Sequence, residues 1–308
     1  MIVAAIQMKV ELGEVKTNLK SAHRLASNAF DEGAELVILP EFFTSAVAFH
    51  PKMLDVVRPI DGEPMQLFKK IAKKHDGIIG GSFIAQRNNE SYNTFVLAFP
   101  DGSVYYHDKD QPTMWENCYY IGGTDDGILE TNIGNIGAAL CWEFVRSRTA
   151  TRLFNRVDLI VGGSCWWSPP TNTPTELREK NLELMIETLA KFAKMLGVHV
   201  IHAAHAGEFT GETPFMPDFE YKSYYVGETQ IVDGNGKIIE RMTREDGEGF
   251  IMADIDIKKK WVPSESIPDR FWIPEMSQAL NQTWERLNNH GELYYRNTTK
   301  PYREQHPL

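Results

Sequence analysis

Short apolar runs alternate with helical patterns over the first part of the chain. The run at 2–6 predicts a strand, and small and apolar residues that then recur every three or four positions predict a helix ending before Gly33. A continuous apolar run follows at 36–39, as expected for a strand covered on both faces. The same reasoning predicts further strands at 77–85, 135–140, 158–161 and 198–201, and helices near 67–72, 147–154 and 176–196.

Turn signals add antiparallel hairpins to this alternation. Pro100-Asp101-Gly102 lies between the strand patterns 93–99 and 104–107. A second such signal, at 233–236, separates the strand patterns 229–232 and 237–240. Helices that alternate with strands, together with hairpins, favour an α/β protein built as a mixed two-sheet sandwich with helices outside.

The rest of the second half is less regular. The stretch 203–223 has no clear period, so we expect a long irregular loop, which in a compact domain is usually functional. A late strand is expected at 249–255 and a helix at 275–287. No repeat, linker or shift in composition divides the chain, which predicts one domain followed by a C-terminal arm.

Charge and cysteine usage narrow the class of protein. The 308 residues include 32 Lys and Arg against 42 Asp and Glu, a net charge of −10. This balance argues against nucleic-acid or anionic-membrane partners, and no run approaches the roughly eighteen apolar residues of a membrane span. The N-terminus lacks the basic start of a signal peptide. Three cysteines with no CxxC pair indicate neither a disulfide framework nor a structural zinc site. We expect a cytoplasmic protein that acts on small molecules.

Three reactive side chains each follow an apolar run: Glu41, Lys109 and Cys141. Alone, each has an ordinary explanation, namely a salt-bridged carboxylate, a solvated ammonium and a small buried hydrophobe. Together they supply a thiol nucleophile, a carboxylate base and a cation for an oxyanion. This combination can carry out acyl transfer without a metal or a cofactor.

The motifs around these residues resemble those of the nitrilase, or carbon–nitrogen hydrolase, superfamily. They are Leu39-Pro40-Glu41-Phe42, Lys109, and Gly137-Ala138-Ala139-Leu140-Cys141-Trp142-Glu143, with Glu116 matching a further family glutamate. The Cys-Trp-Glu sequence and the segment 109–116 are most similar to the nitrilase branch. The match covers 1–257, which we take as the hydrolase domain, and leaves 258–308 as an arm for oligomerisation.

The resemblance implies a four-layer α-β-β-α sandwich that assembles into homodimers or larger homo-oligomers. It also implies roles for the site residues. Cys141 would be the nucleophile, Glu41 the general base and Lys109 the oxyanion stabiliser, with the backbone N–H of Trp142 as a second donor. Glu116, a further catalytic residue, would position the substrate or the lysine and share in the handling of protons.

Other residues are candidates for contacts with substrate. Trp115, Trp142 and Trp166, and the neighbouring Trp167, follow the three motifs and suit an aromatic pocket, although most tryptophans only pack. Arg146 can bind a substrate carboxylate or form a salt bridge.

His205 is either a substrate contact or an ordinary buried histidine. His199 and His202 precede it at intervals of three, which at first suggests a metal cluster. Residues three apart on a strand face opposite sides, so His199 and His202 cannot share a ligand site and we expect no metal.

The function predicted from the sequence is a cofactor-independent hydrolase of non-peptide carbon–nitrogen bonds in a small nitrile or amide. Three alternatives remain open. One is an acyl transferase with the same triad, another is an N-carbamoyl amidohydrolase, and the third is a binding protein without catalysis.

Overall fold

The computed structural model describes residues 1–307, apart from the side chain of Pro217, and its thirteen strands form one hydrogen-bonded network. The main path runs β6-β5-β4-β2-β1-β10-β9-β8-β7, and β3, β11, β12 and β13 pair at its sides. The strands are β1 (Ile2–Lys9), β2 (Leu36–Ile38), β3 (Arg58–Pro59), β4 (Ile78–Arg87), β5 (Glu90–Ala98), β6 (Val104–Asp108), β7 (Ile128–Thr131), β8 (Gly134–Leu140), β9 (Leu159–Ser164), β10 (His199–Thr213), β11 (Met216–Val232), β12 (Ile238–Thr243) and β13 (Gly249–Asp254).

The network folds back on itself, so that two sheet layers enclose an apolar core. Alternate side chains of β1 separate the two faces: Val3 and Ala5 point into this inner core, whereas Ala4 and Ile6 pack toward helices. Leu97 of β5 meets the same inner core from the opposite layer. The predicted four-layer α-β-β-α sandwich is confirmed.

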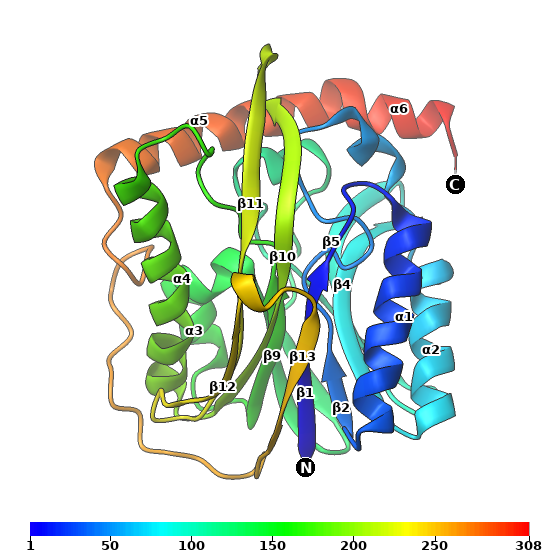
Figure 1. Ribbon diagram of the computed structural model, residues 1–308, viewed down its shortest axis with the longest axis vertical. Coiled ribbons are helices and arrows are strands. Elements are labelled where there is room, and N and C mark those ends of the chain that lie inside the picture. Colours follow the sequence, from blue (N-terminus) through cyan, green and yellow to red (C-terminus); the bar gives the residue numbers. More distant parts are fainter. Residues whose placement is uncertain (308) are drawn as a thin grey trace.

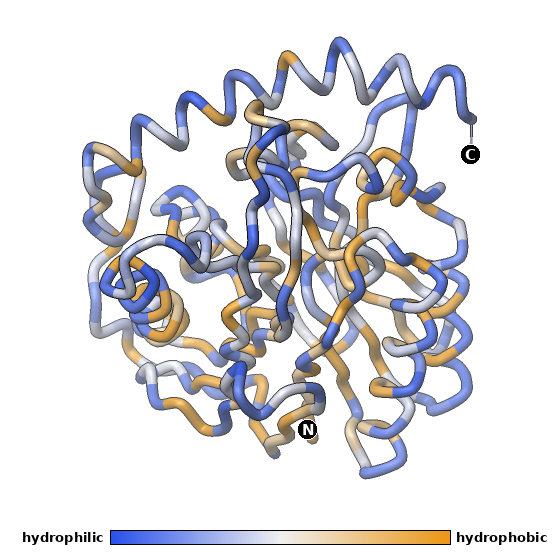
Figure 2. Tube along the Cα trace, turned by 45° about the horizontal axis from the view of Figure 1, so that its top comes forward, coloured by the Kyte–Doolittle hydropathy of each residue, from blue (hydrophilic) through white to orange (hydrophobic). Residues whose placement is uncertain are grey.

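Helices cover both outer faces of the sandwich (Figure 1). The pair α1 and α2 lies on one flank, and the pair α3 and α4 lies on the other. Ala26 of α1 and Phe192 of α4 are fully buried. Along the trace of these helices, hydrophobic and hydrophilic positions alternate, with hydrophilic positions on the outside (Figure 2). The helices are α1 (Val15–Asp31), α2 (Glu63–His75), α3 (Ser147–Leu153), α4 (Thr175–Leu196), α5 (Gln278–Tyr294) and α6 (Lys300–Gln305), with short 3-10 turns η1 (Pro51–Asp55), η2 (Met114–Cys118), η3 (Cys141–Val145) and η4 (Arg244–Asp246) and the π turn η5 (Tyr295–Thr299).

The prediction of an irregular loop at 203–223 is wrong. β10 and β11 continue through this segment as a long antiparallel ribbon, paired from Ala206 and Val226 out toward Thr213 and Met216. The ribbon extends beyond the core, so it lacks a contiguous apolar run. Aromatic rings hold it instead, with Phe209 stacked on Tyr225 at a centroid separation of 4.6 Å.

The C-terminal arm lies across one end of the sandwich, and the tip of the β10–β11 ribbon projects past it (Figure 1). α5 packs so closely on η2 that a Cβ added at Gly291 would lie only 2.7 Å from the Asn117 Cβ. The Asn288 Oδ1 accepts hydrogen bonds from the Met114 N–H at 2.8 Å and the Asn117 amide at 2.9 Å. Within residues 1–307, no helix has the length and apolarity needed to cross a membrane.

Candidate active site

The carboxyl ends of three strands that run in the same direction bring the predicted reactive residues to one edge of the sheet. β2 is parallel to β1 and β4, and β8 is parallel to β9. β6 has the same direction as β4, because both pair antiparallel with β5. Glu41 follows β2, Cys141 directly follows β8, and Lys109 directly follows β6. Groups at the carboxyl ends of such strands share one crevice, as the sequence led us to expect.

Glu41 is fully buried and held by three hydrogen bonds. Its Oε1 accepts from the Lys109 ammonium at 2.9 Å and from the Asn93 amide at 2.8 Å, while its Oε2 accepts from the Cys165 backbone N–H at 2.9 Å. A carboxylate offers about four acceptor positions, so Oε2 retains room for one more donor. Burial raises the pKa of Glu41 to about 7, and nearby Glu116 adds to the rise, while Lys109 opposes it.

Lys109 joins two carboxylates. Its ammonium also donates to Glu116 Oε2 at 2.7 Å, and all three side chains are buried. The same Glu116 oxygen accepts from the Thr113 N–H at 2.9 Å and from the Tyr120 hydroxyl. Burial alone would lower the pKa of Lys109, but the two carboxylates outweigh it and raise the pKa above the ordinary value. Lys109 therefore remains an ammonium.

Cys141 begins η3 with a backbone φ of 50°, a left-handed conformation that few non-glycine residues adopt. Such local strain persists only where the surrounding structure enforces it. Burial, followed by the charge of Glu41, raises the pKa of the Cys141 thiol well above its ordinary value, while Lys109 lowers it. The resting side chain is therefore a neutral thiol beside a buried carboxylate and a cation.

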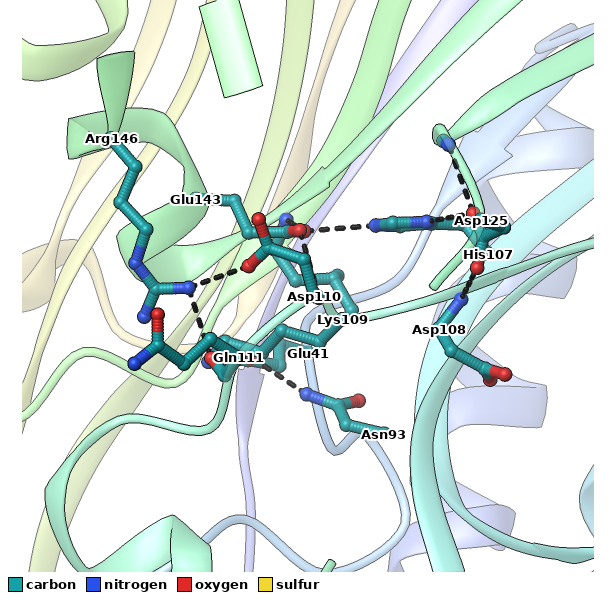
Figure 3. Close-up of polar contacts among 12 residues, drawn as sticks. Glu41, Asn93, His107, Asp108, Lys109, Asp110, Gln111, Asp125, Glu143 and Arg146 are labelled. Carbon is teal, nitrogen blue, oxygen red and sulfur yellow. Dashed lines mark hydrogen bonds and ion pairs between the residues drawn. The ribbon is translucent and has the colours of Figure 1, made fainter. Parts of the chain in front are cut away.

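A second polar cluster lies behind this site and fixes its loops (Figure 3). Glu143 accepts from the N–H of Leu140 at 2.9 Å and from the N–H of Asp110 at 3.1 Å, which ties the turn of Cys141 to the segment of Lys109. His107 Nε2 lies 3.0 Å from Glu143, and Arg152 donates to Glu143 at 2.7 Å.

Asp110 belongs to this rear cluster, although it is the next residue after Lys109. Its carboxylate accepts from Arg146 at 2.6 Å, Arg148 at 2.7 Å and Arg152 at 2.8 Å. The side chains of Lys109 and Asp110 thus serve two separate networks.

A cavity of about 470 Å³ ends at Cys141. Its inner part is lined by four tryptophans, and Trp115 stacks on Trp167 with a centroid separation of 4.2 Å. The amide of Asn181 in α4 accepts from the indole N–H of Trp166 at 3.0 Å and donates to the Trp167 carbonyl at 3.2 Å. The site therefore combines a buried thiol with a fixed aromatic chamber large enough for a small molecule.

The family model for carbon–nitrogen hydrolases matches residues 2–259. The chain belongs to the carbon–nitrogen hydrolase family. It is similar to an N-carbamoylputrescine amidase of Oryza sativa subsp. japonica, with 24% identity over 83% of this chain and 85% of the relative. It is also similar to Nitrilase 1 of Arabidopsis thaliana, with 24% identity over 83% of this chain and 78% of the relative.

The fold matches solved structures as well. A carbon–nitrogen hydrolase from Helicobacter pylori G27 superposes with a TM-score of 0.70 over 100% of this chain and 98% of that one, at 16% identity. The proteins similar to this carbon–nitrogen hydrolase thus include both amidases and nitrilases, so the family alone does not select between amide and nitrile substrates.

Of the residues of the hydrolase that were predicted to contact substrate, some line the cavity and others lie elsewhere. Trp115, Trp142 and Trp166 line the cavity. Arg146 is fully buried in the rear cluster, where it pairs with Asp110. His205 is buried behind the site, with Nε2 donating to the Glu41 carbonyl at 2.7 Å. Neither Arg146 nor His205 is among the residues that line the cavity.

The other two histidines also have structural partners. His202 lies between the Ser164 hydroxyl at 2.7 Å and the Glu228 carbonyl at 3.2 Å, and His199 packs edge-on against Trp261. Across the described part of the chain, no group of three or more His, Cys, Asp or Glu side chains is arranged to hold a metal ion.

Several residues at the site carried no signal in the sequence. Asn93 and Tyr120 reach the carboxylates from β5 and from the turn after η2, and neither belongs to a motif. The outer wall of the cavity comes from α5 and the ribbon tip, segments that are remote in sequence from all three motifs. Only the tertiary structure could reveal these contributions.

Proposed function

We propose that this enzyme hydrolyses small amides, N-carbamoyl compounds included, without a cofactor, through a covalent intermediate on Cys141, which is a thioester from an amide and an S-carbamoyl thiocarbamate from an N-carbamoyl compound. One observation carries the proposal: Cys141 lines the aromatic cavity and lies close to the buried cluster of Glu41 and Lys109. A neutral thiol needs a base at the moment of attack. Glu41, with a pKa of about 7, can take a proton and return it near neutral pH.

The first half-reaction forms the thioester. Glu41 takes the thiol proton as the sulfur of Cys141 bonds to the amide carbon, and the carbonyl oxygen becomes an oxyanion beside the Lys109 ammonium. The tetrahedral intermediate then collapses, the carbon–nitrogen bond breaks, and protonated Glu41 gives its proton to the departing amine or ammonia.

The second half-reaction restores the enzyme. Glu41 takes a proton from water as the water oxygen attacks the thioester carbon. Collapse breaks the carbon–sulfur bond, and the sulfur regains a proton from Glu41. The products are a carboxylic acid, or a carbamic acid from an N-carbamoyl compound, and the free thiol.

Glu116 acts through Lys109. It shares the ammonium with Glu41 and is itself held by the Thr113 N–H and the Tyr120 hydroxyl. Its charge also contributes to the raised pKa of Glu41. We assign it as a positioning residue that keeps the lysine charged and the base poised.

The Cys-Trp-Glu sequence does not by itself select nitriles. Its glutamate, Glu143, faces His107 and Arg152 in the rear cluster and does not line the cavity. The motif is thus explained by the support of the Cys141 turn, which an amidase needs as much as a nitrilase. Nitriles are therefore the alternative substrates in the test.

The test is ammonia release from matched primary amides, N-carbamoyl compounds and nitriles that share one aromatic body. We expect release from amides or carbamoyl compounds by the wild type and by Cys118→Ala, and none by Cys141→Ala. Cys118 is a matched control, because it is a buried cysteine of η2 outside the cavity. Circular dichroism checks that both variants fold.

Two outcomes would overturn the proposal. Activity retained in folded Cys141→Ala would remove the thiol from the reaction, and release from nitriles alone would assign the enzyme to nitrile hydrolysis. Added hydroxylamine separates hydrolysis from acyl transfer. A hydroxamate formed at the expense of acid shows an acyl intermediate, and turnover that requires the added nucleophile shows a transferase.

A further inference from the structure

The outer half of the cavity is built by the C-terminal arm and the ribbon tip. α5 contributes Leu280, Thr283, Arg286, Leu287 and His290 to the wall, and the tip of the β10–β11 ribbon contributes residues 213–216. Phe215 of this tip lies against His290 of α5, with ring centroids 5.2 Å apart, and in Figure 1 the tip projects past α5. A ligand attached to Cys141 that extends through the tryptophans therefore meets α5 with its far end.

The charge of this outer wall is one-sided. Of the described residues that line the cavity, Arg286 is the one whose side chain is permanently positive, and none is Asp or Glu. This contrasts with the net charge of −10 on the whole chain. His290 adds a second basic side chain, with its Nδ1 donating to the Arg286 carbonyl at 2.7 Å.

The Arg286 guanidinium is also uncommitted. It takes part in none of the ion pairs or side-chain hydrogen bonds between the described residues, whereas three other cations of the C-terminal segment, though not Arg303, are paired. Arg270 pairs with Glu275, Arg296 with Glu292 and Lys300 with Glu90. A guanidinium without a partner at the mouth of an apolar chamber is suited to a bidentate bond with a carboxylate.

We propose that the substrate has an aromatic or apolar body and a carboxylate at the end opposite the scissile bond, and that Arg286 selects that carboxylate. The inference rests on the proposed amide hydrolysis and specifies its substrate class. Arg286 is then a specificity residue supplied by the arm, so α5 is part of the substrate site.

Indole faces attract cations too, so an ammonium-ended substrate is the relevant competitor. The arrangement disfavours it, because the Trp115 ring is already stacked on Trp167. An ammonium at the far end would also lie against Arg286, with no lining carboxylate to offset the repulsion. A carboxylate-ended substrate avoids both penalties.

The experiment compares three primary amides with one phenylpropanamide body and a para substituent that is a carboxylate, a methyl group or an aminomethyl group. For the wild type we expect kcat/KM for the carboxylate to exceed that for the ammonium by about tenfold or more, mainly through KM. Arg286→Glu should reverse this order. Arg296→Glu makes the same charge change on an exposed residue of the arm that does not line the cavity, and should preserve the order.

Binding of the same compounds to Cys141→Ala, measured by calorimetry, separates the two proposals. If the wild type hydrolyses none of them while the carboxylate binds in an Arg286-dependent way, amide hydrolysis fails and the anion-binding end of the cavity stands. If the methyl compound is hydrolysed but charge or Arg286→Glu has no effect, the inference fails and hydrolysis stands. An ammonium preference in the wild type, or no binding of any member, also overturns the inference.

Discussion

Two buried clusters lie on either side of the segment of Lys109 and Asp110. The pKa of Glu41 in one cluster and that of Glu143 in the other are shifted in opposite directions. In the front cluster, Glu41 and Glu116 share the single cation Lys109. In the rear cluster, Glu143 lies between His107 and Arg152, and Asp110 is bound by three arginines. Burial penalises charge in both places, so the number of neighbouring cations decides which carboxylate can hold a proton.

The consequences for the protons are clear. The pKa of Glu41 rises to about 7, whereas the cations around Glu143 overcome burial and hold its pKa well below the ordinary value. Burial would lower the pKa of His107, but Glu143 and Asp125 raise it to about 10. The front cluster is therefore able to exchange a proton near neutral pH, while the rear cluster carries fixed charges that hold the loops.

Replacing the front carboxylate should give the largest effect on catalysis. For Glu41→Gln we expect kcat/KM for amide hydrolysis to fall by about 10²–10⁴, the typical contribution of a general base. The free energy of unfolding should fall by only about 1–3 kcal/mol, because the glutamine oxygen still accepts from Lys109, which keeps Glu116 as its counter-charge, while the glutamine nitrogen leaves the buried Cys165 N–H without an acceptor. Steady-state kinetics and urea unfolding measure the two quantities. A variant that loses stability in proportion to its activity would contradict the assignment of a chemical role.

The matched change in the rear cluster should reverse this pattern. Glu143→Gln removes the buried counter-charge that His107 and Arg152 share and leaves them only Asp125 and Asp110, respectively; breaking such a buried pair costs about 3–5 kcal/mol of unfolding free energy. Activity per folded molecule should fall less than in Glu41→Gln, because the introduced amide oxygen can still accept from the Leu140 N–H. If Glu143→Gln abolished turnover without loss of stability, the division between the clusters would be wrong.

The pH profile gives a smaller effect of known sign. Glu41 must be ionised to act as a base, so kcat/KM should fall about tenfold per pH unit below an apparent pKa of about 7. The nearby His202 and His205 cannot produce this limb, because burial lowers their pKa values to about 3 and about 4. Rates on the neutral methyl-substituted amide measure it, and a limb near 4 would show that the pKa of the base is not raised, contrary to the proton exchange near neutral pH assigned to Glu41.

The fold was largely accessible from the sequence because its signals are local. Apolar runs and helical periods predicted the strands around β2 and β8 and the long helix α4 close to their observed ends. The β10–β11 ribbon escaped, because a ribbon that extends beyond the core is held by scattered aromatic pairs and not by an apolar run.

The site was accessible only in part. The sequence pointed to the cluster of Glu41, Lys109 and Glu116, since their motifs follow strands that end at one edge. It gave no direction for Arg146, which follows Cys141 closely but turns away from the cavity toward Asp110. The short spacing from Cys141 shows only that Arg146 can lie near the nucleophile. The direction of the Arg146 side chain depends on how the segment after β6 packs against η3.

The smallest predicted effect links the arm to the front cluster. Asn288 of α5 accepts from the Met114 N–H at the start of η2, the turn that carries Glu116. Asn288→Ala leaves this buried N–H without a partner, which costs about 1–3 kcal/mol of unfolding free energy. We expect kcat/KM to fall only a few-fold, because the Tyr120 hydroxyl and Lys109 still hold Glu116.

Asn289→Ala is the control, since it makes the same change at the next, exposed position of α5 and should alter stability by no more than about 0.5 kcal/mol. Equal effects of the two variants would show that α5 supports η2 through general packing and not through this hydrogen bond.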